Sequence, residues 1–316
     1  ADLLSSFPDR AFERLALDPN FEKVAMKIYS GGLIFHKRCK QVNKLSFIEK
    51  PDSVVDSAAY FYLRRQWWLA VFLGALVVIA GAGIHFYCYP FPSSIAGSIP
   101  AVLVMIYILS LLRCNLRLNI RGEDQDLRAA LGPANWITLA RGGLIAILAG
   151  FMFQPWPGRP HGPGWSSWIP GAVYIFAVVG DTLDGFIARA SATSTRLGEL
   201  LDTRIDALGI LVACLLAINY GQLPGYYISA GLAYYLIKSA IWLRKKSGRP
   251  CSEVRPRPGA RVVAGIQMGF LGIALLPLLS PQLTHIAAVL ILIPFLAGFL
   301  LDWRVASGYG KFVNVD

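Results

Sequence analysis

Residues 67–86 read WWLAVFLGALVVIAGAGIHF and contain no Asp, Glu, Lys or Arg. A helix of about 20 apolar residues spans the hydrocarbon layer of a bilayer. The composition of the whole chain agrees, because 55% of its 316 residues are hydrophobic and only 16% are charged. Soluble domains carry roughly 25% charged residues, and disordered chains are poor in apolar residues. The sequence therefore predicts an all-α membrane protein and excludes an ordinary soluble enzyme.

Seven further apolar runs follow, and each reaches or nearly reaches the length of a membrane span. They cover residues 95–112, 135–153, 165–186, 197–219, 224–243, 262–279 and 285–301. We therefore predict a polytopic protein with about eight transmembrane helices. Residues 1–66 are expected to form a cytoplasmic or interfacial helical segment. Residues 67–113 would add two transmembrane helices, and residues 114–316 would form a six-helix core.

The basic residues predict the orientation in the membrane. Residues 87–94, 154–164, 220–223 and 280–284 would connect spans on one side, and they contain one Lys or Arg between them, Arg159. The connections on the other side are rich in Arg and Lys, which is typical of cytoplasmic loops. With an even number of spans, both termini are then cytoplasmic. The net charge of +11 is thus explained by topology and contact with membrane lipids, and no nucleic-acid partner is expected.

Two groups of residues are assigned no chemistry. The five cysteines include no C-x-x-C pair, so neither a zinc site nor a disulfide framework is indicated. Gly81 and Gly83, inside the first apolar run, are expected to allow close helix packing.

Carboxylates gather at one junction between two apolar runs. From residue 128 to the end the chain has eight acidic residues, and five of them fall within 26 residues. A carboxylate at the centre of a bilayer helix costs about 2.5–3.5 kcal/mol, so several are hard to retain for packing alone. Asp181 and Asp184 are three residues apart, and Asp202 and Asp206 are four apart, so each pair shares one helix face. If the two helices fold back antiparallel, the four carboxylates converge at the cytoplasmic end.

Four carboxylates without His or Cys are typical of a site for a hard cation. Mg²⁺ or Mn²⁺ fits best, since zinc prefers nitrogen or sulfur ligands. The formal charge of the four groups leaves room for two divalent ions. Two metal ions that share such a site usually hold a pyrophosphate or a phosphoryl group under transfer. The alternative is structural, with the aspartates forming interfacial salt bridges to Arg189, Arg196 and Arg204.

The residues around the aspartates favour a ligand. Gly185 and Gly198 lie within predicted helices, where glycine costs about 1 kcal/mol, so they indicate that another group approaches the backbone closely. Ala188 is small and leaves space for a flat group. Arg189 lies near the end of its helix, where its forked guanidinium can reach a phosphate.

Residues 181–206 read DTLDGFIARASATSTRLGELLDTRID. This pattern resembles the signature of the CDP-alcohol phosphotransferase family, D-x-x-D-G-x-x-A-R, eight residues, G-x-x-x-D-x-x-x-D. All eight fixed positions agree: Asp181, Asp184, Gly185, Ala188, Arg189, Gly198, Asp202 and Asp206. The spacing Asn135-x-x-Thr138-x-x-Arg141 is similar to the opening helix of the family. The resemblance covers about residues 131–309, and residues 1–113 lie outside it.

The resemblance implies roles for the aspartates. Asp181, Asp184, Asp202 and Asp206 would bind two divalent metal ions, Mg²⁺ or Mn²⁺. Asp206 would also be the general base that deprotonates the acceptor hydroxyl.

The resemblance also implies a nucleotide site and a reaction. Gly185, Ala188, Arg189 and Gly198 would line the cytidine nucleotide. The enzyme would transfer a phosphoalcohol group from a CDP-alcohol to an acceptor alcohol in phospholipid biosynthesis and release CMP. A homodimer is implied as well.

The location of the site favours CDP-diacylglycerol as the donor, because the site is expected at the lipid interface beside a basic loop. Residues 244–261 contain seven basic residues, most of which topology explains. Arg255, Arg257 and Arg261 stand beside the last pair of spans, where they could bind a phosphate on the acceptor. Glycerol 3-phosphate, inositol phosphate, inositol and serine are the candidate acceptors.

Two other functions fit part of the sequence. A membrane prenyltransferase also uses aspartates with Mg²⁺ on a diphosphate, but its motifs usually lie on well-separated helices and lack the G-x-x-A-R element. A membrane scaffold or assembly subunit could retain an inactive core, and the unassigned residues 1–113 keep that alternative open.

Overall fold

The computed structural model describes residues 54–91, 93–121, 126–157, 164–190, 195–248 and 258–307. Within these ranges the chain forms eight α-helices, and the β-structure there is limited to an isolated antiparallel bridge between Ile120 and Leu127. The predicted all-α polytopic fold is therefore confirmed. The helices are α4 (Val54–Cys88), α5 (Ser93–Cys114), α6 (Pro133–Ala149), α7 (Ile169–Ala190), α8 (Arg196–Asn219), α9 (Ile228–Lys246), α10 (Pro258–Ala274) and α11 (Pro281–Ala306).

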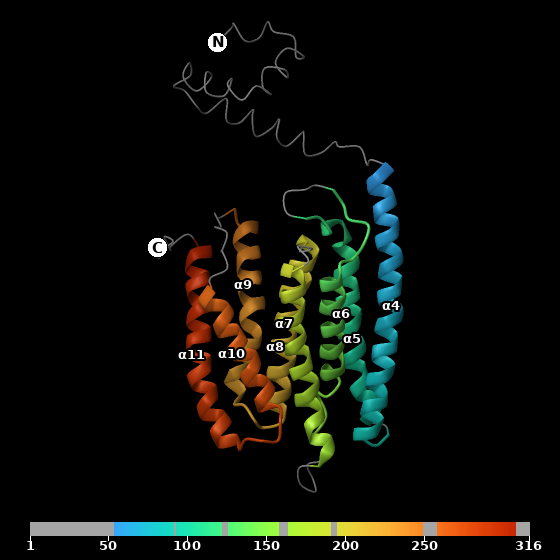
Figure 1. Ribbon diagram of the computed structural model, residues 1–316. Coiled ribbons are helices and arrows are strands. Elements are labelled where there is room, and N and C mark those ends of the chain that lie inside the picture. Colours follow the sequence, from blue (N-terminus) through green and yellow to red (C-terminus); the bar gives the residue numbers. More distant parts are fainter. Residues whose placement is uncertain are drawn as a thin grey trace, which may run out of the picture. The chain divides into compact units, whose positions relative to one another are not determined.

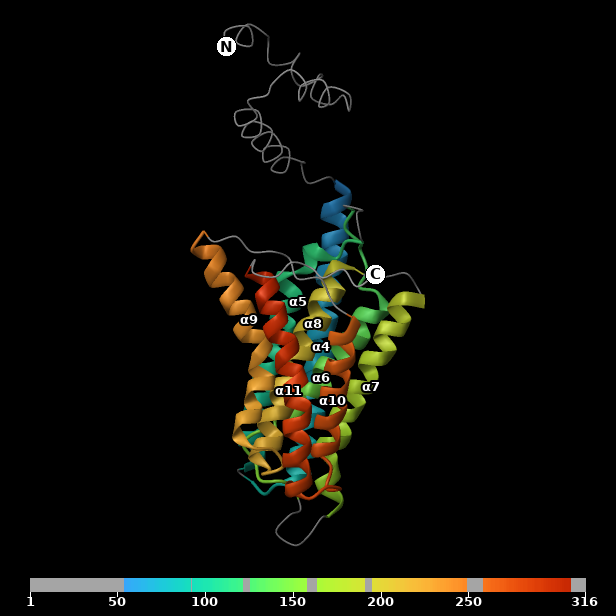
Figure 2. The same ribbon diagram turned by 90° about the vertical axis from the view of Figure 1, so that its left-hand side faces the viewer.

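Each helix corresponds to one of the predicted apolar runs, and successive helices alternate in direction (Figures 1 and 2). Three segments are by themselves long and apolar enough to cross a membrane, namely Ala58–Cys88, Ser93–Cys114 and Pro281–Ala306. Helix α6 is shorter and carries buried Asn135, Thr138 and Arg141. Polar residues inside a membrane protein face the interior of the bundle, so the outer surface of the bundle stays apolar.

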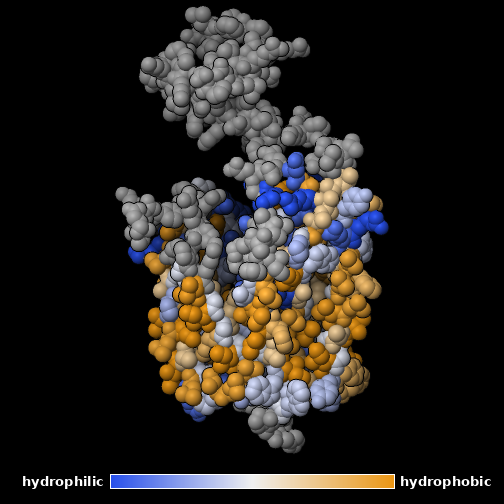
Figure 3. All heavy atoms as spheres, viewed as in Figure 1, coloured by the Kyte–Doolittle hydropathy of each residue, from blue (hydrophilic) through white to orange (hydrophobic). Residues whose placement is uncertain are grey.

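The surface of the bundle divides into an apolar band and a polar end (Figure 3). Large apolar side chains such as Phe72, Ile79 and Leu290 are exposed on the band. The polar end is the end at which α4 begins, and Arg64, Arg113 and Arg244 lie there. At the opposite end the described connections, residues 89–91, 154–157, 220–227 and 275–280, contain no Lys or Arg. The distribution of charge along the bundle therefore agrees with the loop pattern in the sequence.

Helix α6 lies inside the bundle and packs against α5, α7 and α8 (Figure 2). Its first turn begins at Pro133, which suits a position where no backbone N–H is needed. Its second half is buried almost continuously, from Ile145 to Ala149. Side chains on α6 can therefore contact α7 and α8 at once.

Glycines allow α4 to pack closely against its neighbours. A Cβ on Gly81 would lie 3.0 Å from Ile147 Cγ1, so this glycine allows close packing as predicted. Gly83 differs, because no atom lies within 4 Å of its Cβ position. The side chain of His85 on α4 packs closely between Gly97 and Gly150 and is 1% exposed.

Replacing Gly97 by Ala should destabilise the protein. The new Cβ would lie 2.6 Å from His85 Nδ1 and 2.9 Å from the Gly150 carbonyl oxygen. Overpacking of this kind costs about 1–3 kcal/mol. Thermal unfolding in detergent should show a lower midpoint for Gly97→Ala. Gly83→Ala is the matched control, and it should unfold no earlier than the wild type, because it adds helix propensity without a clash. A Gly97→Ala protein as stable as the wild type would contradict this packing.

Candidate functional site

The carboxylates of the predicted signature come from two antiparallel helices. Asp181 lies in the second half of α7, and Asp202 and Asp206 lie in the first half of α8. Helix α8 begins where it does because Thr195 caps it, accepting a hydrogen bond from the Gly198 N–H at 3.1 Å. Since α7 ends and α8 begins at the polar end (Figure 1), the three carboxylates converge there, as expected from their spacing.

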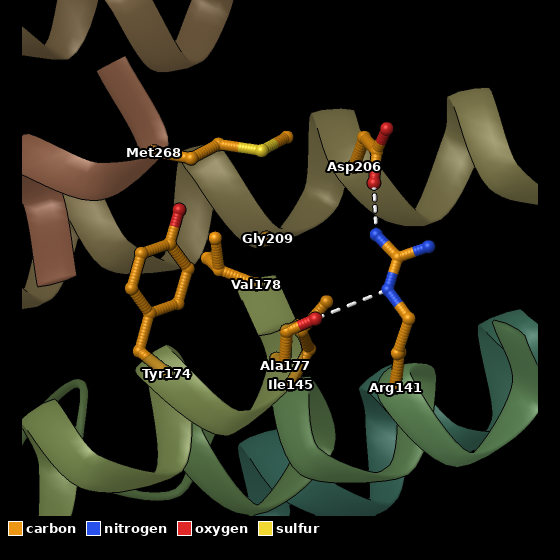
Figure 4. Close-up of a pocket in the computed structure, with 8 residues that line it drawn as sticks. All are labelled: Arg141, Ile145, Tyr174, Ala177, Val178, Asp206, Gly209 and Met268. Carbon is orange, nitrogen blue, oxygen red and sulfur yellow. Dashed lines mark hydrogen bonds and ion pairs between the residues drawn. The ribbon is translucent and has the colours of Figure 1, made fainter. Parts of the chain in front are cut away.

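Arg141 of α6 holds these carboxylates together. Its Nη1 donates to Asp202 Oδ1 at 2.8 Å, and its Nη2 pairs with Asp181 Oδ1 at 2.9 Å. Nη2 also donates to Asp206 Oδ1, and Nε donates to the Ala177 carbonyl oxygen at 3.1 Å (Figure 4). One guanidinium thus ties α6 to both α7 and α8.

Burial makes this ion-pair network important for the fold. The Arg141 side chain is 4% exposed, whereas Asp181, Asp202 and Asp206 are 34%, 42% and 26% exposed. A buried guanidinium without partners would cost several kcal/mol, and removing one partner of a buried ion pair typically costs about 3–5 kcal/mol. The aspartates thus do form salt bridges, as in the structural alternative. Their partner here is Arg141, which that alternative did not include.

The same carboxylates form a candidate cation site. One ligand oxygen from each of Asp181, Asp202 and Asp206 lies within 4.8 Å of the others. Three carboxylates against one guanidinium leave two negative charges in excess when all are ionised. Oxygen donors with excess negative charge suit Mg²⁺ or Mn²⁺. Because the three carboxylates are partly exposed and Arg141 is not, a ligand can reach the carboxylates more readily than the guanidinium.

Gly180 makes room for the Arg141 side chain. A Cβ on Gly180 would lie 2.8 Å from Arg141 Cγ and 3.1 Å from its Cδ. The glycine directly before Asp181 therefore lets the stem of the arginine pass against α7. The sequence analysis predicted neither the contact between Gly180 and Arg141 nor the ion pairs of Arg141.

Gly198 also permits a close approach, and the approaching group is Asn135 of α6. A Cβ on Gly198 would lie 2.6 Å from Asn135 Oδ1. The prediction that this glycine admits a close neighbour is thus met by a protein side chain. Asn135 is itself buried, so the opening pattern of α6 contacts the start of α8 at this point.

A small cleft lies beside Arg141 and Asp206 (Figure 4). Arg141 and Asp206 lie at one end of it, and Tyr174 and Met268 lie at the other. Its free space admits about one water molecule. A nucleotide does not fit in this space.

Several predicted site residues lie outside the described part of the structure. Helix α7 includes Asp184, Gly185, Ala188 and Arg189, but the side chains of Asp184, Ala188 and Arg189 and the surroundings of Gly185 are outside the described part. The same holds for the side chain of Arg261 in α10, and for the whole of Arg255 and Arg257. Their roles stay predictions.

The sequence profile described as CDP-alcohol phosphatidyltransferase matches residues 131–300, which is more than half of the chain. The chain belongs to this family. Within this CDP-alcohol phosphatidyltransferase family member, the matched region begins just before α6 and ends in α11. Helices α4 and α5 precede it.

Two curated relatives illustrate the similarity. A CDP-diacylglycerol–glycerol-3-phosphate 3-phosphatidyltransferase from Yersinia pestis (strain Pestoides F) is 29% identical over 90 residues, covering 28% of this chain and 46% of that protein. A protein of the same name from Pseudomonas fluorescens is 34% identical over 85 residues, covering 27% of this chain and 40% of that protein. The chain thus spans less than half the length of these relatives. No solved structure matches it.

The signal that could have identified Arg141 is its position. It is the one Lys or Arg in the predicted span 135–153. A charge inside a span needs a partner, and the nearest predicted carboxylates lie on the two following spans. The sequence does not give the rotation of α6 relative to α7 and α8, so it does not name the partners.

Gly180→Ala should disturb the ion-pair network. Arg141 is buried and bonded along its whole guanidinium, so its stem has little freedom to avoid a new Cβ at 2.8 Å. We expect a loss of about 1–3 kcal/mol of stability, seen as a lower unfolding midpoint in detergent. Gly269→Ala is the control, because Gly269 lies in α10 with no atom within 4 Å of its Cβ position. Equal midpoints for the two variants would show that Gly180 is not needed for Arg141 to pass.

Proposed function

We propose that this protein transfers a phosphatidyl group from CDP-diacylglycerol to a small polar alcohol and releases CMP. Membership of the CDP-alcohol phosphatidyltransferase family supports a transferase of phospholipid synthesis. The observation that carries the proposal is the convergence of Asp181, Asp202 and Asp206 around Arg141 at the polar end of the bundle. A lipid donor suits a site that lies beside an apolar surface band.

Asp181, Asp202 and Asp206 would hold a divalent ion, Mg²⁺ or Mn²⁺. Their oxygens lie within 4.8 Å of one another and supply the hard donors that these ions prefer. The family signature adds Asp184 as a fourth ligand and a second ion. Ions bound there would supply positive charge to offset the negative charge of the donor's pyrophosphate and of the CMP leaving group. Arg141 contributes by holding the three carboxylates at fixed positions before any substrate arrives.

Asp206 is the proposed general base. Arg141 binds one of its oxygens, and the second oxygen points away from the guanidinium (Figure 4). The acceptor hydroxyl oxygen would form a bond to the phosphorus that carries the diacylglycerol. The bond from this phosphorus to the oxygen of CMP would break, CMP would leave with the electron pair, and Asp206 would take the hydroxyl proton.

The substrates would bind on the polar side of the carboxylates. We propose, from the signature, that Gly185, Ala188, Arg189 and Gly198 line the cytidine nucleotide. The end of α7 and the start of α8 both lie at the polar end (Figure 1). From their place in the sequence, Arg255, Arg257 and Arg261 would bind an acceptor that carries a phosphate.

The direct test is CMP release by the purified protein. CDP-diacylglycerol and Mn²⁺ would be supplied with glycerol 3-phosphate, inositol phosphate, inositol or serine in turn. One acceptor should support turnover, and a phosphorylated one is expected if the three arginines bind phosphate. Asp202→Asn should lower CMP release at least about a hundredfold, because even residues that only support a metal ligand cost 10–100-fold when replaced.

Glu199→Gln is the matched control for Asp202→Asn. Glu199 lies in the first turn of α8 and is exposed, and the change likewise replaces a carboxylate by an amide. It should keep wild-type turnover. Unchanged turnover in Asp202→Asn at low Mn²⁺ would contradict the metal assignment. No CMP release with any acceptor would favour a scaffold or assembly role.

We further propose that all eight helices cross the membrane and that the polar end faces the cytoplasm, because basic connections are retained on that side. In a variant without native cysteines, Phe153→Cys and Lys245→Cys would place thiols at opposite ends of the bundle. Phe153 is 78% exposed near the end of α6, and Lys245 is exposed in the last turn of α9. In sealed vesicles, an impermeant thiol reagent should label Lys245→Cys only from the cytoplasmic face and Phe153→Cys only from the other. Labelling of both from one face would contradict this topology.

A further inference from the structure

A second pocket lies outside the region that matches the family. Tyr60, Arg64 and Trp67 of α4, Arg113 of α5, and Leu116 of the short helix η1 (Leu116–Leu118) line it. We call it the α4–α5 pocket. Its volume is about 90 Å³, several times what one water molecule needs. It lies at the polar end, where α4 begins and α5 ends.

One arginine of the α4–α5 pocket, Arg113, is held in place by an aromatic ring. Its guanidinium carbon lies 4.6 Å from the centre of the Trp67 ring, which also lines the pocket. Trp67 is fixed in turn, because its Nε1–H donates to the Leu109 carbonyl oxygen at 2.9 Å. A guanidinium whose face is stacked on a ring keeps N–H groups at its edge for an anion.

The charge of the pocket is positive. The described residues that line it include Arg64 and Arg113 and no carboxylate. Among the described residues, neither Arg64 nor Arg113 forms an ion pair with another side chain. Arginine binds phosphate oxygens through paired N–H groups. The lining therefore fits a phosphate, and it offers no counter-charge for a cationic group attached to that phosphate.

Exposed apolar side chains follow the pocket along the length of α4 and α5, away from the polar end. Arg64, Trp68 and Phe72 are spaced by four residues and so share one face of α4. Trp68 is 56% exposed and Phe72 is 61% exposed. On α5, exposed Ile106 lies two turns before Arg113. A ligand with its phosphate at the arginines would have apolar surface directly below for acyl chains.

We propose that the α4–α5 pocket binds the headgroup phosphate of an anionic phospholipid, with its acyl chains along Trp68 and Phe72. A net negative charge on the lipid is favoured because the described lining has two arginines and no carboxylate for an ammonium group. The floor of the pocket belongs to a buried cluster that includes Trp67, Leu116 and Leu201. Leu201 directly precedes Asp202 on α8, so a bound lipid adds contacts to the cluster that holds the start of this helix.

The experiment measures lipid binding by the full chain in a zwitterionic detergent. Short-chain phosphatidylglycerol, short-chain phosphatidylcholine and inorganic phosphate are titrated separately, with bound ligand counted by native mass spectrometry. Phosphatidylglycerol should bind more tightly than phosphatidylcholine, and added salt should weaken it. Arg64→Gln and Arg113→Gln should each weaken phosphatidylglycerol binding at least about tenfold, as expected for loss of a charge-assisted hydrogen bond.

Arg304→Gln is the matched control, because Arg304 is exposed in the last turn of α11 at the same polar end. It should bind phosphatidylglycerol like the wild type. If Arg113→Gln does not fold, Arg64→Gln decides, since Arg64 is exposed on the surface of α4.

Three results would overturn the proposal. The first is a folded Arg64→Gln protein with wild-type affinity for phosphatidylglycerol. The second is equal affinity for phosphatidylglycerol and phosphatidylcholine. The third is inorganic phosphate that binds as tightly as phosphatidylglycerol and displaces it, which would identify a soluble phosphate as the ligand. Because binding is measured without turnover, the result does not depend on the proposed transferase activity.

Discussion

The guanidinium of Arg141 is the interaction on which the centre of this bundle depends. A positive charge inside an apolar helix is stable only when it is paired, and here its partners are Asp181, Asp202 and Asp206. The pairing fixes α6 against α7 and α8 and gathers carboxylates that would otherwise repel one another. The same contacts that stabilise the packing therefore assemble the candidate metal site.

Close packing around Arg141 depends on small residues at a few positions. Gly180 lets the arginine stem pass against α7, and Gly198 lets Asn135 approach α8. In a membrane, helices associate largely through van der Waals packing and hydrogen bonds between helices, so such glycines are favoured at interfaces. The role of Gly198 in the signature is thus explained in part by the fold, separately from any contact with a nucleotide.

The sequence predicted the eight helices because each apolar run has the length of a span, and it predicted the convergence of the aspartates because helical spacing places each pair on one face. It did not predict the contacts of Arg141, because spacing along one helix does not fix how that helix is rotated against another. The α4–α5 pocket was missed for the same reason, since Arg64 and Arg113 come from different helices. Helix α4 begins at Val54, before the predicted apolar run, because the helix continues through the polar residues that precede that run.

We propose that the carboxylates gathered by Arg141 hold a divalent ion. The most direct measurement is a crystal structure of the protein grown with Mn²⁺, with data collected to show the anomalous scattering of manganese. We predict an anomalous peak in contact with carboxylate oxygens of Asp181, Asp202 and Asp206, and no such peak in Asp202→Asn under the same conditions. A wild-type map with no peak among these carboxylates, at a Mn²⁺ concentration that supports CMP release, would contradict the claim.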